Sequence, residues 1–144
     1  MGRMSTKYRV QNPKNNEIVE SFDFITDDEL ETALTAANDT FKQWREKSFE
    51  ERAEVLRKVA ELFDEQRAEL TRIIAEEMGK SVKEGDGEID DVVEIFNYYA
   101  DNGAEFGADE EIPNQRGGTS VMRKVPLGVI LGIMPWNFPY YQVA

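Results

Sequence analysis

The stretch that decides the fold covers residues 126–139 and reads PLGVILGIMPWNFP. Within it, residues 128–134 are uncharged and do not alternate between polar and apolar side chains. Such a run is typical of a parallel strand that is covered on both faces. We therefore predict a buried β-strand here. No earlier segment offers a parallel partner in a βαβ unit, so we expect its sheet to be completed after Ala144 or by another chain.

A loop with two prolines follows this predicted strand directly, at the end where open α/β sheets bind their ligands. Pro135 and Pro139 restrict the backbone around a single amide side chain, that of Asn137. An amide NH₂ group held in this way is a good neutral hydrogen-bond donor to a developing oxyanion. From the loop alone, a second interpretation stays open, in which Asn137 caps the following helix.

Upstream, the sequence predicts short strands and then helices. Residues 8–10 and 17–22 flank a turn-rich segment and read as two short strands. Thr26 and Glu29 have the spacing of a capping box, and apolar residues follow at helical intervals as far as Trp44. The first helix is therefore predicted to begin after Thr26.

Three more helices are predicted before residue 107. Ser48 begins a second capping box, and Gly79 can end a later helix in the left-handed conformation. Apolar residues repeat at helical spacing over residues 82–106, but glycines weaken the first turns, so we place the start of this helix near Glu88. Four aromatic residues at helical spacing are predicted to be core: Phe41, Trp44, Phe96 and Tyr99.

A hairpin is predicted between these helices and the apolar strand. Residues 113–118 are turn-like, and residues 119–125 have the composition of a half-exposed strand. We expect this strand to pair with residues 109–112. The acidic run at 109–111 is then an exposed charge cluster on an edge strand, where like charges discourage aggregation.

Composition excludes several kinds of function. The chain has 144 residues, within the range of one domain, and carries 29 acidic against 17 basic residues, a net charge of −12. Such a charge repels nucleic acid. There is no secretory segment, and the longest apolar stretch, residues 125–136, is too short for a membrane helix. We expect a soluble, cytoplasmic protein that binds neither nucleic acid nor membrane.

The chain contains no Cys and no His, so disulfides, thiolate metal sites and histidine bases are absent. We predict no metal site. Asp90 and Asp91 are predicted to lie on a solvated helix face and not to bind a cation. The last residues are apolar and aromatic, unlike the polar ends of most domains, so we expect the chain to stop inside a core.

Two segments make the sequence similar to the aldehyde dehydrogenase superfamily: residues 126–139 and the run Glu77-Met78-Gly79-Lys80-Ser81. The resemblance covers nearly the whole chain and implies an α/β N-terminal fragment. Its expected parts are short strands, four or so amphipathic helices, an oligomerisation-type hairpin and the first strand of a Rossmann-like parallel sheet. The implied boundaries are 1–108 for the strands and helices of the cofactor-binding domain, 109–126 for the hairpin, and 127–144 for a truncated strand and active-site loop.

The resemblance also implies a reaction. In this family a cysteine thiolate attacks an aldehyde, a hydride passes to NAD(P)⁺, and water releases the acid. Asn137 matches the oxyanion-hole asparagine, and Phe138 matches a wall of the aldehyde tunnel. The cofactor site is matched by Ile133, Met134, Pro135 and Trp136. The family's catalytic cysteine and general base lie further downstream, so these 144 residues alone are expected to be inactive.

Finer features resemble bacterial NAD(P)-dependent succinate-semialdehyde dehydrogenases. They are residues 80–84, the helix bearing Asp90, and residues 139–142, and they imply succinate semialdehyde as the small-molecule aldehyde. The choice between NAD and NADP stays open. By analogy, the full-length protein is expected to be a homodimer or homotetramer. The alternative is a non-catalytic acidic helical interaction domain derived from such an enzyme, and the sequence beyond Ala144 would distinguish the two.

Overall fold

A computed structural model describes residues 8–115 and 117–144. Short strands, helices and a hairpin follow one another in the predicted order. In chain order they are β1 (Tyr8–Gln11), β2 (Ile18–Phe22), α1 (Asp27–Trp44), α2 (Phe49–Glu65), α3 (Arg67–Met78), α4 (Val82–Phe106), β3 (Glu110–Ile112), β4 (Ser120–Met122) and α5 (Pro139–Val143). The mixed α/β composition that the sequence predicted is confirmed.

Both predicted capping boxes are present. The hydroxyl of Thr26 accepts from the N–H of Glu29, whose carboxylate accepts from the N–H of Thr26 at 2.8 Å. Ser48 and Glu51 repeat this arrangement at the start of α2. Each box satisfies backbone donors that the first helical turn leaves unpaired. The starts of α1 and α2 are therefore fixed by local sequence.

The turn between α3 and α4 depends on Gly79, which has a φ of 78°. Its N–H donates to the carbonyl of Ala75, which closes α3 in the left-handed conformation that glycine adopts without steric cost. A Cβ atom at this position would also come 3.0 Å from Pro13 Cγ. The sharp turn at Gly79 directly precedes Lys80, whose side chain is buried.

Helix α4 begins at Val82, so the predicted start near Glu88 was too late. Ser81 caps the helix by accepting from the N–H of Glu84. Gly85 faces α3, where a Cβ would lie 3.1 Å from Thr71 Cγ2 and therefore meet a packed surface. The cap and the close packing offset the low helix propensity of the glycines.

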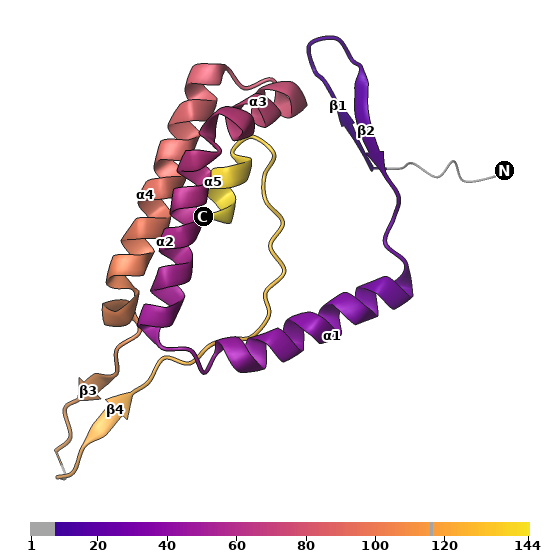
Figure 1. Cartoon of the computed structure of the whole chain (residues 1–144). Coiled ribbons are helices and arrows are strands. Elements are labelled where there is room, and N and C mark those ends of the chain that lie inside the picture. Colours follow the sequence, from indigo (N-terminus) through magenta and orange to yellow (C-terminus); the bar gives the residue numbers. More distant parts are fainter. Residues whose placement is uncertain (1–7, 116) are drawn as a thin grey trace.

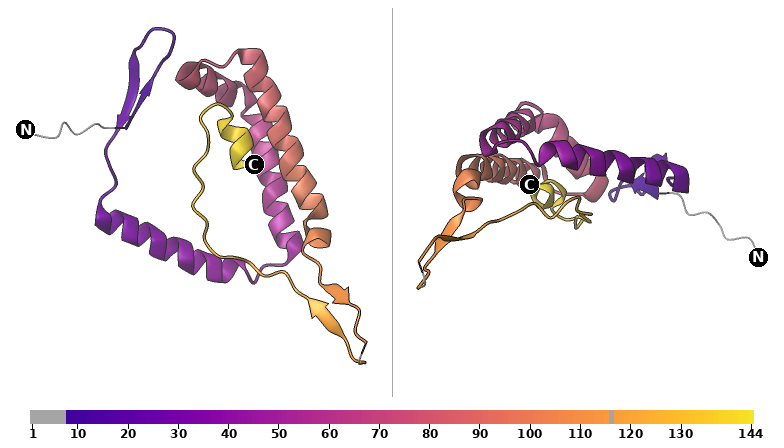
Figure 2. Two further views of the ribbon diagram at one scale, coloured as in Figure 1. Left: turned by 180° about the vertical axis from the view of Figure 1, so that it is seen from behind. Right: turned by 90° about the horizontal axis from the view of Figure 1, so that it is seen from below.

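The core lies where α2 and α4 run side by side, with α3 across one end and α5 packed on α4 (Figures 1 and 2). The buried apolar residues come from three helices: Ala53, Ala60, Ile74, Ile89, Val92 and Ala100. None of the helices within residues 8–115 and 117–144 combines the length and apolar content needed to cross a membrane.

The strands form two separate antiparallel hairpins. Tyr8 pairs with Phe22 in the first hairpin, and Glu110 pairs with Met122 in the second. Both predicted pairings are confirmed. The last strand, Ser120–Met122, is shorter than the predicted 119–125 because β3 has only three residues to pair with it.

Helix α1 contributes nothing to the core and has no buried residue. It lies away from the other helices (Figure 1). Trp44, on this helix, and Tyr99, on α4, are exposed, so the prediction that they are core is wrong for this chain, whereas Phe41 and Phe96 are half-buried. An apolar face becomes core only when another element covers it, and no described element covers α1.

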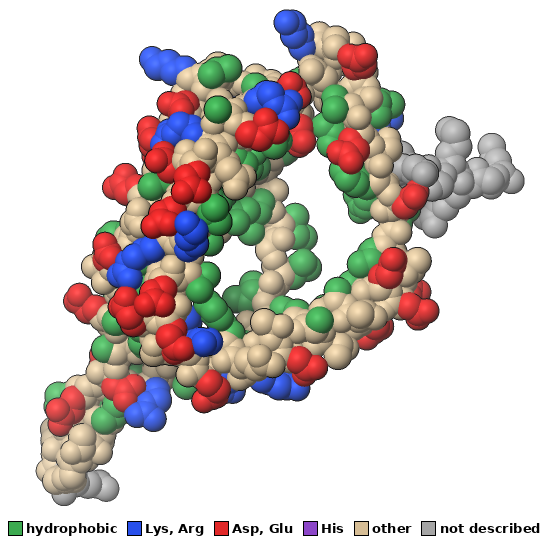
Figure 3. Space-filling view, viewed as in Figure 1, with side chains coloured by type: hydrophobic (Ala, Val, Ile, Leu, Met, Phe, Trp, Pro, Cys, Tyr) green, Lys and Arg blue, Asp and Glu red, His purple; other side chains and the backbone are tan. Residues whose placement is uncertain are grey.

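The predicted buried strand over residues 128–134 is also wrong for this chain. The segment forms no strand and runs alone past an open space to α5 (Figure 1). Leu131 is 86% exposed and Ile133 is 84% exposed. A strand needs a hydrogen-bonded neighbour, and the described residues supply none here. Figure 3 shows hydrophobic side chains gathered around the opening that this segment borders.

Candidate active site

The loop before α5 presents one amide side chain. Trp136 and Asn137 form a turn, and Asn137 is exposed. Its side chain makes no hydrogen bond to any residue that the structure describes. Phe138, and not Asn137, is the N-cap of α5, and it contributes no side-chain bond. The interpretation of Asn137 as a helix cap is therefore wrong.

The first turn of α5 is capped from a distant part of the chain. Oε1 of Glu88, on α4, accepts from the N–H of Tyr140 at 2.9 Å and from the N–H of Tyr141 at 3.0 Å. The Glu88 side chain is completely buried. A carboxylate at this place satisfies two backbone donors and lies at the positive end of the helix. Glu88 therefore fixes where α5 begins.

Lys80 completes this arrangement from the turn after α3. Its ammonium donates to Oε2 of Glu88, and its side chain is only 7% exposed. The same Nζ lies 3.6 Å from the centroid of the Phe138 ring, within cation–π distance. Both oxygens of the buried carboxylate are thus engaged, as a buried charge requires. We call Lys80 and Glu88 the buried pair.

Tyr140 attaches the same short helix to α2 and α3. Its hydroxyl donates to the carbonyl of Leu70 at 3.2 Å, and its ring packs edge-on against Phe63 with centroids 5.7 Å apart. Burial, and then the negative charges of nearby glutamates, raise the pKa of the Tyr140 hydroxyl. The hydroxyl therefore stays protonated and able to donate at neutral pH.

The residues predicted to line the cofactor site, Ile133 to Trp136, all lie on the exposed segment before α5. Ile133 and Trp136 present most of their surface to solvent, and Met134 is less exposed. Trp136 also borders a cavity of about 260 Å³, together with Ile73, Ile74, Glu77, Met78, Pro139 and Tyr140. The segment offers one apolar wall. At Trp136, the opposite wall of the cavity is formed by Ile73, Ile74 and Met78 of α3.

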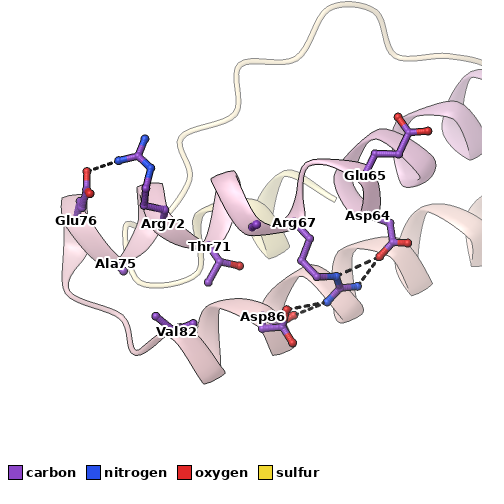
Figure 4. Close-up of a pocket in the computed structure, with 10 residues that line it drawn as sticks. Asp64, Glu65, Arg67, Thr71, Arg72, Ala75, Glu76, Val82 and Asp86 are labelled. Atoms are coloured by element: carbon purple, nitrogen blue, oxygen red, sulfur yellow. Dashed lines mark hydrogen bonds and ion pairs between the residues drawn. The ribbon is translucent and has the colours of Figure 1, made fainter.

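A larger cavity, of about 650 Å³, lies between α3 and α4 (Figure 4). Most of its charged side chains pair with one another: Arg67 contacts Asp64 and Asp86, and Arg72 contacts Glu76. None of the predicted site residues lines this cavity. We therefore place the candidate site at the Asn137 loop and not in the larger cavity.

The acids on α4 that could have suggested a cation site are exposed, as predicted. Asp90 pairs with Arg67 at 2.8 Å. Across residues 8–115 and 117–144, no group of three or more His, Cys, Asp or Glu side chains is arranged to hold a metal ion.

The sequence predictions missed both members of the buried pair as site residues. Gly85, Glu88, Ile89 and Val92 are all buried and follow the spacing of one helix face. A carboxylate within such an apolar stripe is rarely buried without a partner. That pattern could have marked Glu88, although nothing in it identifies Lys80 or α5 as the partner.

Helix α5, whose first turn is capped by Glu88, directly follows the exposed amide of Asn137 between two prolines. The sequence matches the Aldehyde dehydrogenase family over residues 2–144. The chain belongs to this family.

Curated relatives agree with this assignment. The chain is 37% identical over 142 residues to a succinate-semialdehyde dehydrogenase [NADP(+)] of Deinococcus radiodurans, covering 99% of this chain and 30% of the relative. It is 33% identical over 143 residues to a D-glyceraldehyde dehydrogenase (NADP(+)) of Thermoplasma acidophilum, covering 99% of this chain and 28% of that protein. The chain thus spans about 30% of the length of the relatives that it matches.

Solved structures share the arrangement of the elements. Succinic semialdehyde dehydrogenase from Streptococcus pyogenes, in complex with NADP⁺, superposes with a TM-score of 0.89 at 36% identity, over 94% of this chain and 30% of that one. A betaine aldehyde dehydrogenase from Staphylococcus aureus, in complex with NAD⁺, gives a TM-score of 0.86 at 29% identity, over 96% of this chain and 28% of that one. The predicted aldehyde dehydrogenase-like fold is confirmed.

Proposed function

We propose that this chain is the front part of an NAD(P)⁺-dependent enzyme that oxidises an aldehyde to its acid, with Asn137 as an oxyanion donor. The observation that carries the proposal is the exposed amide of Asn137, which has no hydrogen-bond partner among the described residues and directly precedes a firmly anchored helix. The proposed parts are residues 1–108 for the cofactor-binding domain, 109–126 for the hairpin of the oligomerisation element, and 127–144 for the strand and active-site loop.

In the proposed reaction, the thiolate of a cysteine outside these residues attacks the aldehyde carbon, and the carbonyl oxygen becomes negative. The Asn137 amide donates to this oxygen, which stabilises the charge more in the transition state than in the free aldehyde. Bound NAD(P)⁺ would supply the hydride acceptor, and water would then release the acid from the cysteine. Phe138 forms an apolar wall beside the aldehyde and excludes water from one side of it.

The exposed segment before α5 fits one side of a dinucleotide. Ile133, Met134 and Trp136 offer apolar surface and backbone groups to a planar ring. Lys80, which contacts the Phe138 ring, is already paired with Glu88. In the proposal, the groups that hold the cofactor phosphates come from other residues of the full-length protein.

Succinate semialdehyde is the proposed substrate, and NADP⁺ the favoured cofactor. This choice is supported by relatives named for that substrate and cofactor. Homo-oligomerisation through the hairpin of β3 and β4 is also part of the proposal. Ile112, Val121 and Met122 leave apolar surface exposed on this hairpin, and a second subunit would cover it.

The test uses the full-length protein with succinate semialdehyde and with butanal, an uncharged aldehyde of the same chain length. We expect reduction of NADP⁺ with equal formation of acid, and a higher kcat/KM for succinate semialdehyde. A folded protein that oxidises neither aldehyde with NAD⁺ or NADP⁺ would instead support the acidic interaction domain. A preference for butanal would overturn the substrate assignment alone.

A further inference from the structure

The buried pair has no part in the proposed reaction, and yet it contacts the residues that directly follow Asn137. Lys80 and Glu88 are separated from Asn137 by about fifty residues of sequence, and both side chains are almost fully buried. Burying an ion pair costs desolvation energy that its attraction often only matches, so stability alone is a weak reason for such a pair. Its contacts indicate another role.

All the contacts of the buried pair with this region fall on residues directly after Asn137. Lys80 lies over the ring of Phe138, and Glu88 accepts from the backbone of Tyr140 and Tyr141. The residues before Asn137 are exposed and have no strand partner among the described residues. Within this chain, the placement of Asn137 therefore depends on the anchored residues that follow it.

We propose that Lys80 and Glu88 are positioning residues. They hold the Asn137 amide within hydrogen-bonding distance of the aldehyde oxygen, and they hold the Phe138 ring beside the aldehyde. This inference rests on the proposed function of Asn137. Glu88 fixes the first turn of α5, while Lys80 neutralises Glu88 and fixes the ring of Phe138. Neither side chain touches substrate or cofactor. A small displacement of a catalytic group is enough to reduce turnover strongly.

This role also explains part of the Glu77-Met78-Gly79-Lys80 run that the sequence analysis identified. Gly79 takes a left-handed conformation that ends α3. The chain turns there, and Lys80 enters the space beneath α5 instead of extending α3 into solvent. The run therefore links the end of α3 to the active-site loop.

The test compares variants of the full-length protein. Glu88→Ala removes the acceptor for both amides. Glu88→Gln combined with Lys80→Met removes both charges but keeps an acceptor oxygen and an apolar contact with the Phe138 ring. Glu105→Gln, on the exposed surface of the same helix, is the matched control. Two quantities are measured: kcat per folded molecule, and amide hydrogen exchange of the peptide that covers residues 136–144.

We expect Glu88→Ala to speed exchange of the Tyr140 and Tyr141 amides and to lower kcat by about 100-fold, with little change in the KM for the cofactor. In the double variant, kcat should rise again towards the parent value and amide exchange should slow again. The control should match the parent in both quantities. If Glu88→Ala does not fold, Glu88→Gln alone replaces it. That variant leaves Lys80 buried without a counter-charge, and it should lose turnover that the added Lys80→Met restores.

Normal kcat per folded Glu88→Ala molecule would overturn the positioning role, as would unchanged exchange at Tyr140 and Tyr141. A double variant with no recovery of kcat would do so as well, because the acceptor oxygen and the apolar contact that it keeps would then not be what positions Asn137. Failure of the proposed function looks different. In that case Asn137→Ala keeps its turnover, while the exchange of residues 136–144 still responds to Glu88→Ala.

Discussion

The ring of Phe49, at the start of α2, lies directly against Gly107, which caps the end of α4, and leaves no room for a β-carbon there. Gly107 has a φ of −94°, so an alanine would suffer no backbone strain and would act only through this contact. We expect Gly107→Ala to lower the free energy of unfolding by about 1 kcal/mol, the low end for overpacking, because Phe49 is 40% exposed and its ring can move aside. Denaturant unfolding of the two proteins measures the difference.

Gly103→Ala is the control for this prediction, because Gly103 lies inside the same helix and a Cβ there meets nothing within 4 Å. Alanine should stabilise α4 at that position by roughly 0.5–1 kcal/mol. If both alanines stabilise the protein equally, Phe49 does not occupy the surface of Gly107.

Arg67 connects three acidic side chains at the junction of α2, α3 and α4. It contacts Asp64 at 2.7 Å, Asp86 at 3.2 Å and Asp90 at 2.8 Å. The hydrogen bond with Asp64, followed by those with Asp90 and Asp86, raises the pKa of the Arg67 guanidinium, although desolvation opposes this. Since the acids are largely exposed, we expect Arg67→Ala to cost only roughly 1 kcal/mol. The loss should shrink at high salt in unfolding experiments.

Arg72 is the matched comparison, because it pairs only with Glu69 and Glu76 of its own helix and is more exposed than Arg67. Arg72→Ala should therefore cost less stability than Arg67→Ala. If Arg72→Ala loses as much stability as Arg67→Ala or more, the ion pairs of Arg67 with Asp86 and Asp90 on α4 add nothing to stability.

Local signals explain which elements could be predicted from the sequence. The capping boxes at Thr26 and Ser48 lie within four residues of the turns that they cap, so their spacing was sufficient. Gly79 likewise ends α3 through its own backbone conformation. The contact between Glu88 and Tyr140 joins residues 52 apart, and no local pattern specifies such a pair.

The wrong predictions of burial share one physical cause. Periodicity shows which residues are suited to burial, but burial also needs a covering surface. Trp44 lies on a helix that no described element covers, and residues 128–134 have no neighbouring strand. The sequence therefore identified the apolar surfaces, but no local pattern in it shows what covers them.

The capping boxes predict a response to acid. The hydrogen bond from Lys47, followed by those from the backbone and hydroxyl of Ser48, lowers the pKa of Glu51 from 4.5 to about 2. A lowered carboxyl pKa contributes stability that is fully present above 4.5 and is lost as the pH falls towards 2. We expect the unfolding midpoint of the parent to fall across this window more steeply than that of Glu51→Gln. If the unfolding midpoints of the parent and of Glu51→Gln fall in parallel with pH, the lowered pKa of Glu51 does not contribute this stability.

The exposed segment before α5 predicts self-association of the 144-residue chain. Leu131 and Ile133 lie almost fully in solvent, and such apolar surface favours association. We expect the chain to bind an apolar dye strongly and to form oligomers in sedimentation experiments. Leu131→Glu combined with Ile133→Glu should reduce both effects. Thr35→Glu, on the exposed surface of α1, adds charge without removing apolar surface and should leave both effects unchanged.

The most direct prediction concerns the amide of Asn137 in the full-length protein. Asn137→Ala removes a neutral donor to the developing oxyanion, and it should lower kcat by about 100 to 1000-fold, equivalent to roughly 3–4 kcal/mol. Asn137→Asp keeps the shape of the side chain but places a negative charge beside the oxyanion, so it should lose at least as much. Asn15→Ala, in the exposed turn between β1 and β2, is the control and should keep normal turnover. An Asn137→Asp variant that remains active would show that this side chain supplies shape and no hydrogen bond.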